Sequence, residues 1–200
     1  MQFSNIEIFI ERLKEEDNEE LSSFSCGDDT LDDFFHHEIL ICSKYHYVSS
    51  YCARNKTNNE IVAVFTLTND AVILGNSEDK ADFIEEAATK MPEEYRSIFE
   101  KQTSFPAVNI GHLGVRKDMQ SRGIGKQILD FILSTFIAYK GSGCQFITVD
   151  SLNNRRTNKF YASNGFTNQT NMDITESTRR MYLPIELYRD EDEDKDEDEG

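Results

Sequence analysis

A short run of small and basic residues ahead of a long apolar helix has the residue types that could bind a phosphate. Residues 120–126 read Gln-Ser-Arg-Gly-Ile-Gly-Lys, and apolar side chains then recur at helical spacing. The first turn of a helix has N–H groups without intrahelical partners, and the helix dipole adds partial positive charge. Gly123 and Gly125 would let an anion approach this backbone, and Arg122 and Lys126 add charge. The spacing therefore predicts an anion site here.

Two common phosphate-binding motifs do not fit this spacing. A P-loop needs G-x-x-x-x-G-K-[ST], whereas Gln127 follows Lys126 here, and a dinucleotide-binding fold needs a third glycine. The pattern Gln120-x-x-Gly123-x-Gly125 instead resembles the Q/R-x-x-G-x-G/A element of the GNAT acyltransferase superfamily. In that family, the backbone amides of this element hold the pyrophosphate of acetyl-CoA. A helix that merely begins with glycines is the alternative.

A second motif lies one helix and one strand further along. Residues 149–166 resemble the GNAT element in which a strand end precedes N-x-x-A-x-x-F-Y-x-x-x-G-F. The matching residues are Asn154, Phe160, Tyr161, Gly165 and Phe166, while Thr157 replaces the usual alanine. Because both elements occur in the right order and at the right separation, the chain is identified as a member of this superfamily.

A third motif points to one branch of the superfamily. Residues 24–32 read F-x-C-G-x-x-x-L-D, which resembles the N-terminal segment of a branch that includes toxins of toxin–antitoxin pairs acetylating aminoacyl-tRNA. The alternative is an ordinary amphipathic helix capped by Asp28 or Asp29. Cys26, taken by itself, is better explained by this alternative.

The resemblance implies an α/β (α+β) GNAT fold, with a mixed, mostly antiparallel central sheet of about six to seven strands and helices on both faces. Two parallel strands would splay apart into a cleft, where pantetheine can lie like an extra strand. One domain is expected over residues 1–189. Residues 190–200 hold nine acids and one lysine and are predicted to be a disordered tail. We expect surface helices at residues 78–90 and 92–101 and a solvated turn at residues 15–20.

Composition narrows the class of protein. The chain contains no run of about 18 apolar residues and no leader-like N-terminus, so we expect neither a membrane span nor secretion. Its four cysteines lack metal-binding spacing, which predicts reduced thiols, no metal and a cytoplasmic location. The net charge is −16, yet residues 114–160 hold eight basic and three acidic residues. This basic island coincides with the predicted phosphate site.

The resemblance also implies roles for individual residues. The N–H near Leu113 is the candidate oxyanion donor, and Tyr161, a phenol that is protonated at neutral pH, is the candidate general acid for the thiolate. Packing beside CoA is the alternative for Tyr161, and helix capping is the alternative to pantetheine binding for Asn154. The expected acetyl-CoA-binding residues are Leu113, Gly114, Val115, Gln120, Ser121, Arg122, Gly123, Ile124, Gly125, Lys126, Asn154, Phe160 and Tyr161.

The sequence leaves alternatives for the general base and for the amine that accepts the acetyl group. Asn109 stands roughly where many relatives place a carboxylate, and His112 is a candidate base with a structural role as the alternative. The main hypothesis is N-acetylation of a small-molecule or peptide amine. The second is a toxin acting on aminoacyl-tRNA, which the acidic charge disfavours; the third is a non-catalytic CoA-binding module. A homodimer and an antitoxin partner are both left open.

Overall fold

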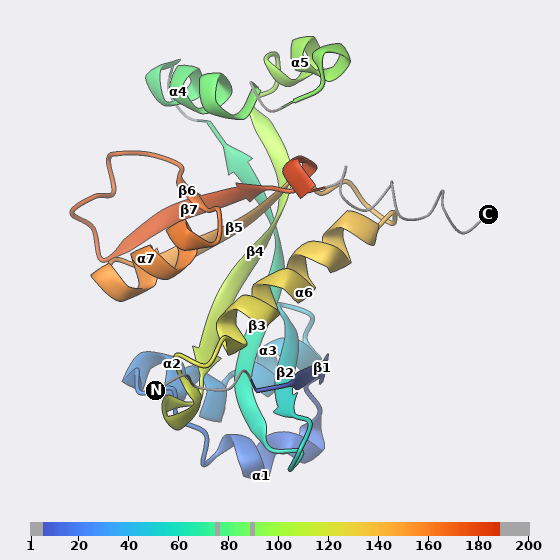
Figure 1. Ribbon diagram of the computed structural model, residues 1–200, viewed down its shortest axis with the longest axis vertical. Helices are drawn as coiled ribbons and strands as arrows, with labels where there is room; N and C mark the ends of the chain where they lie inside the picture. Colours follow the sequence, from blue (N-terminus) through green and yellow to red (C-terminus); the bar gives the residue numbers. More distant parts are fainter. Residues whose placement is uncertain (1–5, 75–76, 89–90, 189–200) are drawn as a thin grey trace. The chain divides into compact units, whose positions relative to one another are not determined.

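The computed structural model describes residues 6–74, 77–88 and 91–188 (Figure 1). The chain forms two compact units, the first being Met1–Thr68 with Ile110–Ile132 and the second Asn69–Asn109 with Leu133–Gly200. The residues of β3 and of β4 are each divided between the two units. The predicted single domain ending at residue 189 stays a prediction, and the acidic tail lies outside the described residues.

The strands that the structure describes form a sheet in the order β1-β2-β3-β4-β5-β7-β6. Their bounds are β1 (Ile8–Arg12), β2 (Ser49–Asn55), β3 (Ile61–Ile73), β4 (Ser104–Val115), β5 (Phe146–Leu152), β6 (Thr167–Asn168) and β7 (Thr178–Pro184). The pairs β1–β2, β2–β3, β5–β7 and β6–β7 are antiparallel, whereas β4 and β5 are parallel. The mixed, mostly antiparallel sheet predicted from the sequence is confirmed.

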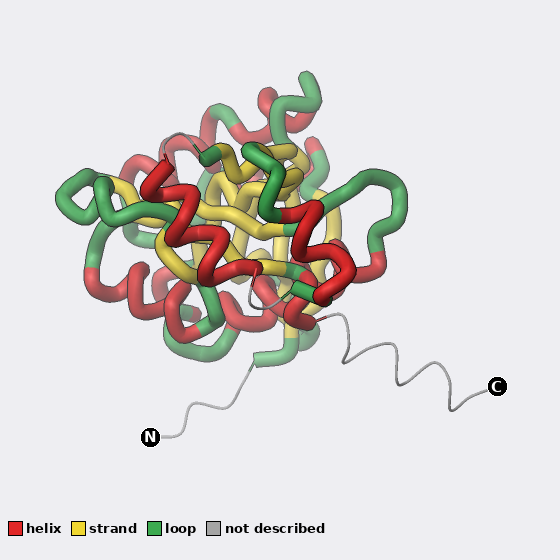
Figure 2. Tube along the Cα trace, turned by 90° about the horizontal axis from the view of Figure 1, so that it is seen from above, coloured by secondary structure: helices red, strands yellow, loops and turns green. Residues whose placement is uncertain are grey.

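Helices separate these strands, and Figure 2 distinguishes both by colour. The α-helices are α1 (Asn18–Leu21), α2 (Asp29–His37), α3 (Ile39–Lys44), α4 (Ser77–Ala88), α5 (Glu93–Phe99), α6 (Ile124–Ala138) and α7 (Arg155–Ser163). The short 3-10 helices are η1 (Glu15–Asp17), η2 (Lys117–Met119) and η3 (Glu186–Tyr188). Helix α2 begins where predicted, because Asp28 Oδ1 accepts hydrogen bonds from the N–H groups of Thr30 and Leu31 at 3.1 and 3.0 Å.

The first unit has helices on both faces of its strands. Helices α2 and α3 bury Phe35 and Ile39 against Cys52 and Val64. The opposite face of β2 and β3 presents Tyr51 and Phe65, whose stacked rings meet Phe131 of α6 edge-on. Strand alternation separates the two sets of side chains, so α6 is fixed by its apolar stripe on the face opposite α2 and α3.

The second unit is built around an aromatic core. Phe83 of α4 and Phe99 of α5 pack with Phe105, Phe146 and Tyr182 of the strands, and all five are nearly inaccessible to solvent. The segments predicted as surface helices therefore each bury an aromatic side chain. Helix α7 covers the other face of β5, where Ser151 Oγ donates to Asn158 Oδ1 at 3.5 Å.

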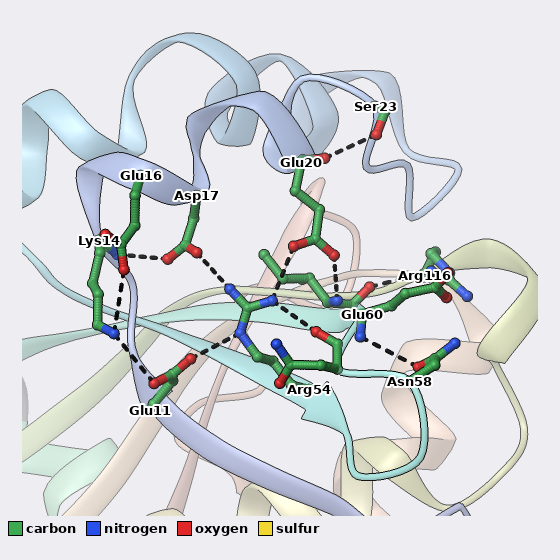
Figure 3. A network of polar contacts seen from close by, with 12 residues as sticks. Glu11, Lys14, Glu16, Asp17, Glu20, Ser23, Arg54, Asn58, Glu60 and Arg116 are labelled. Carbon is green, nitrogen blue, oxygen red and sulfur yellow. Dashed lines mark hydrogen bonds and ion pairs between the residues drawn. The ribbon is translucent and has the colours of Figure 1, made fainter.

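The acidic stretch at residues 15–20 differs from its prediction as a solvated turn. It forms η1 and α1, and two of its carboxylates, those of Asp17 and Glu20, bind the buried guanidinium of Arg54 (Figure 3). Arg54 Nη2 donates to Asp17 at 2.5 Å, Nη1 to Glu20 at 2.9 Å and Nε to Glu11 of β1 at 2.8 Å. Burying a guanidinium is costly unless it is paired and hydrogen-bonded, which explains why acids gather here.

Replacing Arg54 with Met should lower the free energy of unfolding by about 3–5 kcal/mol, because Asp17 would be left buried without a cation. Urea denaturation measures the effect. Lys14, which pairs at the surface with Glu11 and Glu16, provides the control. Lys14→Met should cost less than about 1 kcal/mol. Equal, small losses in both variants would contradict the buried pairing.

Candidate active site

The predicted phosphate-binding turn has a backbone suited to an anion. Ser121 and Gly123 both adopt positive φ angles, 62° and 78°, and α6 begins at Ile124. The N–H of Gln127 donates to the carbonyl of Gly123 at 3.1 Å, which closes the first turn of the helix. The N–H groups of residues 124–126 therefore precede the intrahelical ladder. Gly123 and Ser121 are exposed, so the turn is accessible to a ligand.

The side chains around this turn have two different tasks. Gln120 Nε2 donates to the carbonyls of Cys26 at 2.7 Å and Val115 at 3.0 Å, so this side chain ties the turn to the end of β4. Lys126 is exposed and forms an ion pair with Asp130, one turn along α6, at 3.0 Å. Binding of a phosphate would compete with this exposed pair, which costs little to open.

The third sequence motif supports the same turn. Asp32 accepts hydrogen bonds from Ser25 Oγ at 2.6 Å and from the N–H of Cys26 at 2.7 Å, which folds the segment before α2 onto its first turn. The N–H of Lys117, in η2, donates to the carbonyl of Ser25 at 2.9 Å. Burial raises the pKa of the Cys26 thiol to about 12, so this cysteine packs and does not react at neutral pH. The motif thus has a local structural role: it holds the predicted phosphate-binding turn.

Replacing Asp32 with Asn should destabilise the protein by about 1–3 kcal/mol at pH 7. Burial raises the pKa of Asp32, but the hydrogen bonds from Ser25 and Cys26 outweigh burial and lower it overall. A lowered carboxyl pKa contributes stability above the unfolded pKa, and this contribution is lost as pH falls through the folded pKa. The difference in the free energy of unfolding between the unaltered protein and Asp32→Asn, measured by urea denaturation, should therefore become smaller in acid. A difference that is constant from pH 7 to about pH 3 would contradict this assignment.

The end of β4 has no room for a side chain at Gly114. A Cβ there would lie 2.6 Å from Cε2 of Phe35 and 3.1 Å from Cβ of Cys26. The neighbouring residues Leu113 and Val115 are half-buried. The close packing of α2 against Gly114 fixes the path of the strand whose N–H and C=O groups are the predicted pantetheine partners.

His112 lies on β4 in a partly apolar setting. Its ring stacks on Phe34 with centroids 3.7 Å apart, and its Nδ1 shares a hydrogen bond with Thr66 Oγ1 at 3.0 Å. Burial lowers the pKa of His112, which favours the neutral imidazole. A neutral imidazole can accept a proton, so the role of general base stays a prediction beside the packing role that these contacts demonstrate.

Tyr161 lies in α7 of the second unit, and its ring is wedged between aromatic neighbours. Its centroid is 5.1 Å from that of Phe160 and 5.2 Å from that of Phe166, and the residue is 5% exposed. Burial raises the pKa of Tyr161 well above its usual range, so the phenol keeps its proton and remains a donor. Within the described residues, its hydroxyl makes no hydrogen bond to the protein.

Asn154 caps α7. Its Oδ1 accepts hydrogen bonds from the N–H of Thr157 at 3.0 Å and from Thr157 Oγ1 at 3.1 Å. The helix-capping alternative is therefore observed, and Thr157 serves as the partner of the cap. The side-chain nitrogen of Asn154 takes no part in these bonds, so pantetheine binding stays a prediction.

Sequence reasoning named Asn109 but missed the row of polar side chains to which it belongs, and this row crosses the strands of the second unit. Its members are Asp70 of β3, Asn109 of β4, Thr148 and Asp150 of β5, and Arg180 of β7. Their only signal in the sequence was that each interrupts or ends an otherwise apolar strand. No group of metal-binding side chains, and no helix able to cross a membrane, is found in the described ranges.

The comparisons with known proteins agree with this architecture. Residues 86–168 match the model of the acetyltransferase (GNAT) domain, a segment that contains both the turn and the α7 motif. No curated protein sequence matches the chain. Among solved structures, a Tyr-to-Phe variant of KacT superposes with a TM-score of 0.68 at 17% identity, covering 89% of this chain and 95% of that one. AtaT in complex with acetyl-methionyl-tRNAfMet gives 0.63 at 18% identity, covering 89% and 95%.

The matched segment lies within the chain's GNAT domain, and the chain has the fold of the acetyltransferases AtaT and KacT. A third similar structure is AtaT bound to the C-terminus of the antitoxin AtaR and to acetyl-CoA, with a TM-score of 0.64 and 18% identity over 90% of this chain and 96% of that one.

Proposed function

We propose that this chain transfers the acetyl group of acetyl-CoA to a primary amine by direct attack. The observation that carries the proposal is the turn with positive φ at Ser121 and Gly123, set at the start of α6 within a GNAT fold. Backbone N–H groups of this turn, with Arg122 and Lys126, bind the diphosphate. The backbone of β4 near Leu113 and Val115 binds the pantetheine arm, with Asn154 as a further partner.

The protein groups then have complementary tasks. The N–H near Leu113 stabilises the negative charge that develops on the thioester oxygen. Tyr161 donates its proton to the departing sulfur, because its buried phenol stays protonated at neutral pH. The acceptor amine must lose a proton before it can attack, and His112 is one candidate to receive it.

The acceptor is a small-molecule or peptide amine, or the α-amino group of an aminoacyl-tRNA. The second candidate is favoured by the structural likeness to AtaT and KacT and by the sequence motif at residues 24–32. Exposed Arg155, Arg156 and Lys159 of α7 add cationic surface. The net charge of −16 opposes RNA binding. If the acceptor is aminoacyl-tRNA, we expect an antitoxin partner. A homodimer and a cytoplasmic location are compatible with both acceptor classes.

One assay separates these functions. Release of free CoA thiol is followed with acetyl-CoA and three acceptors: a polyamine, a peptide with a free N-terminus, and methionyl-tRNA. Turnover with the polyamine or peptide supports the first acceptor class, and turnover with methionyl-tRNA alone supports the second. Filter binding of charged tRNA checks the latter, because failure to bind at low salt excludes it. Tight acetyl-CoA binding without turnover on any acceptor would leave a non-catalytic CoA-binding module.

A further inference from the structure

The polar row of the second unit is fully connected from β3 to β7. Asn109 Nδ2 donates to Thr148 Oγ1 at 3.2 Å and to Asp150 Oδ2 at 3.4 Å. Thr148 Oγ1 donates to Asp70, and Arg180 binds both Asp70 and Asp150, the latter at 2.7 Å between Nη1 and Oδ2. Two carboxylates thus share one guanidinium, which leaves the row with one negative charge in excess.

The row faces away from α7. Ser151 points toward α7, where it bonds to Asn158, so Thr148 and Asp150 point to the opposite face of β5 by strand alternation. The side chain of Asp150 is 54% exposed, against 22% for Arg180 and 22% for Asp70. Asp150 is therefore the carboxylate that a ligand arriving from solvent meets first.

The contacts of Asp150 within the described residues leave one of its oxygens available. Both Arg180 and Asn109 bond to Oδ2, which fixes the orientation of the carboxylate and leaves Oδ1 to accept a further hydrogen bond. A carboxylate with one oxygen anchored and the other open to solvent suits an ammonium group, which is a donor and carries positive charge.

We infer that Asp150 binds the ammonium group of the acceptor and takes its proton, with Arg180 and Asn109 as positioning residues. The inference rests on the proposed function and names a second candidate proton acceptor besides His112, the one candidate base that the sequence offered. Primary amines are largely protonated at neutral pH and have no lone pair for attack. A site with excess negative charge selects this cationic form, whereas a neutral acceptor would gain nothing from it.

The proton and bond balance is complete with acetyl-CoA as the only co-substrate. Asp150 takes the first proton of R–NH₃⁺ and later returns it to solvent, to which its side chain is exposed. The amine lone pair forms the C–N bond, and the C–S bond breaks with its electron pair on sulfur. The sulfur takes the proton of Tyr161, and the phenol is restored by the second proton that nitrogen loses. The products are the amide, free CoA thiol and one proton.

The test is Asp150→Asn, which keeps the shape of the side chain and an acceptor oxygen for Arg180. With the acceptor that the unaltered chain acetylates, kcat/KM should fall about 10²–10⁴-fold at pH 7, while the dissociation constant of acetyl-CoA stays within threefold. Asp150→Asn can acetylate only acceptor molecules whose amine is already neutral. Below the amine pKa, the neutral fraction of the amine grows about tenfold for each unit by which the pH rises. The deficit of Asp150→Asn should therefore shrink as pH rises.

Asp33→Asn is the control, because Asp33 is an exposed aspartate of α2 that pairs with His37. It should leave kcat/KM unchanged. A loss in Asp150→Asn that is the same at every pH, or no loss at all, would overturn the inference and leave the proposed function intact. Absence of thiol release by the unaltered chain with the polyamine, the peptide and methionyl-tRNA would overturn the proposed function, and the inference with it.

Discussion

Gly123→Glu should abolish acetyl-CoA binding, with no signal at about 100 times the dissociation constant of the unaltered protein. The carboxylate would project from the turn at the position proposed for the diphosphate, where like charges repel. Gly123 also has a φ of 78°, which a residue with a Cβ adopts only with strain. Calorimetric titration with acetyl-CoA measures the loss.

Two variants separate charge from backbone strain. Gly123→Ala introduces the strain without the charge, about 1–2 kcal/mol, and should retain measurable binding. Gly143→Glu adds the same charge at an exposed glycine whose Cβ would meet only Pro106 Cγ, at 3.8 Å, and should bind normally. Binding by Gly123→Glu within threefold of the unaltered protein would show that the diphosphate binds elsewhere.

Tyr161→Phe should lower kcat by about 10²–10⁴-fold and leave the acetyl-CoA dissociation constant within threefold. The hydroxyl makes no hydrogen bond to the protein within the described residues, and the phenyl ring keeps its contacts with Phe160 and Phe166. The melting temperature should therefore change little. What is lost is the proton that the sulfur needs as it departs.

Single-turnover thiol release and thermal melting measure the two halves of this prediction. Tyr139→Phe is the matched control, since Tyr139 is half exposed and lies just beyond α6. If Tyr161→Phe turns over at the normal rate, Tyr161 only packs in α7 and another group protonates the sulfur. A large drop in melting temperature would instead show that the hydroxyl stabilises the fold.

Local patterns in the sequence were sufficient to predict the turn at residues 120–126 and the helix α6 that follows it. The glycine spacing and the apolar stripe lie within one segment, so the sequence predicts both the helix start and its buried face. Capping of α2 by Asp28 and of α7 by Asn154 depends on residues two or three positions away. Such short-range chemistry is visible in the sequence.

Features that depend on distant residues were not predictable in this way. Asp17 and Glu20 look like part of a solvated acidic stretch until β2 brings Arg54 beside them, 37 and 34 residues away. Asp70 and Arg180 are 110 residues apart, and only the strand order brings them together. Polar residues inside apolar strands were the available signal, but their partners follow from the sheet.

Amide hydrogen exchange of the turn, with and without acetyl-CoA, tests whether the backbone N–H groups of residues 123–126 bind the diphosphate of acetyl-CoA. These amides, which precede the intrahelical ladder of α6, should exchange fast in the free protein and become strongly protected when acetyl-CoA binds. Saturating acetyl-CoA that protects other segments but leaves these amides unchanged would contradict binding of the diphosphate at this turn.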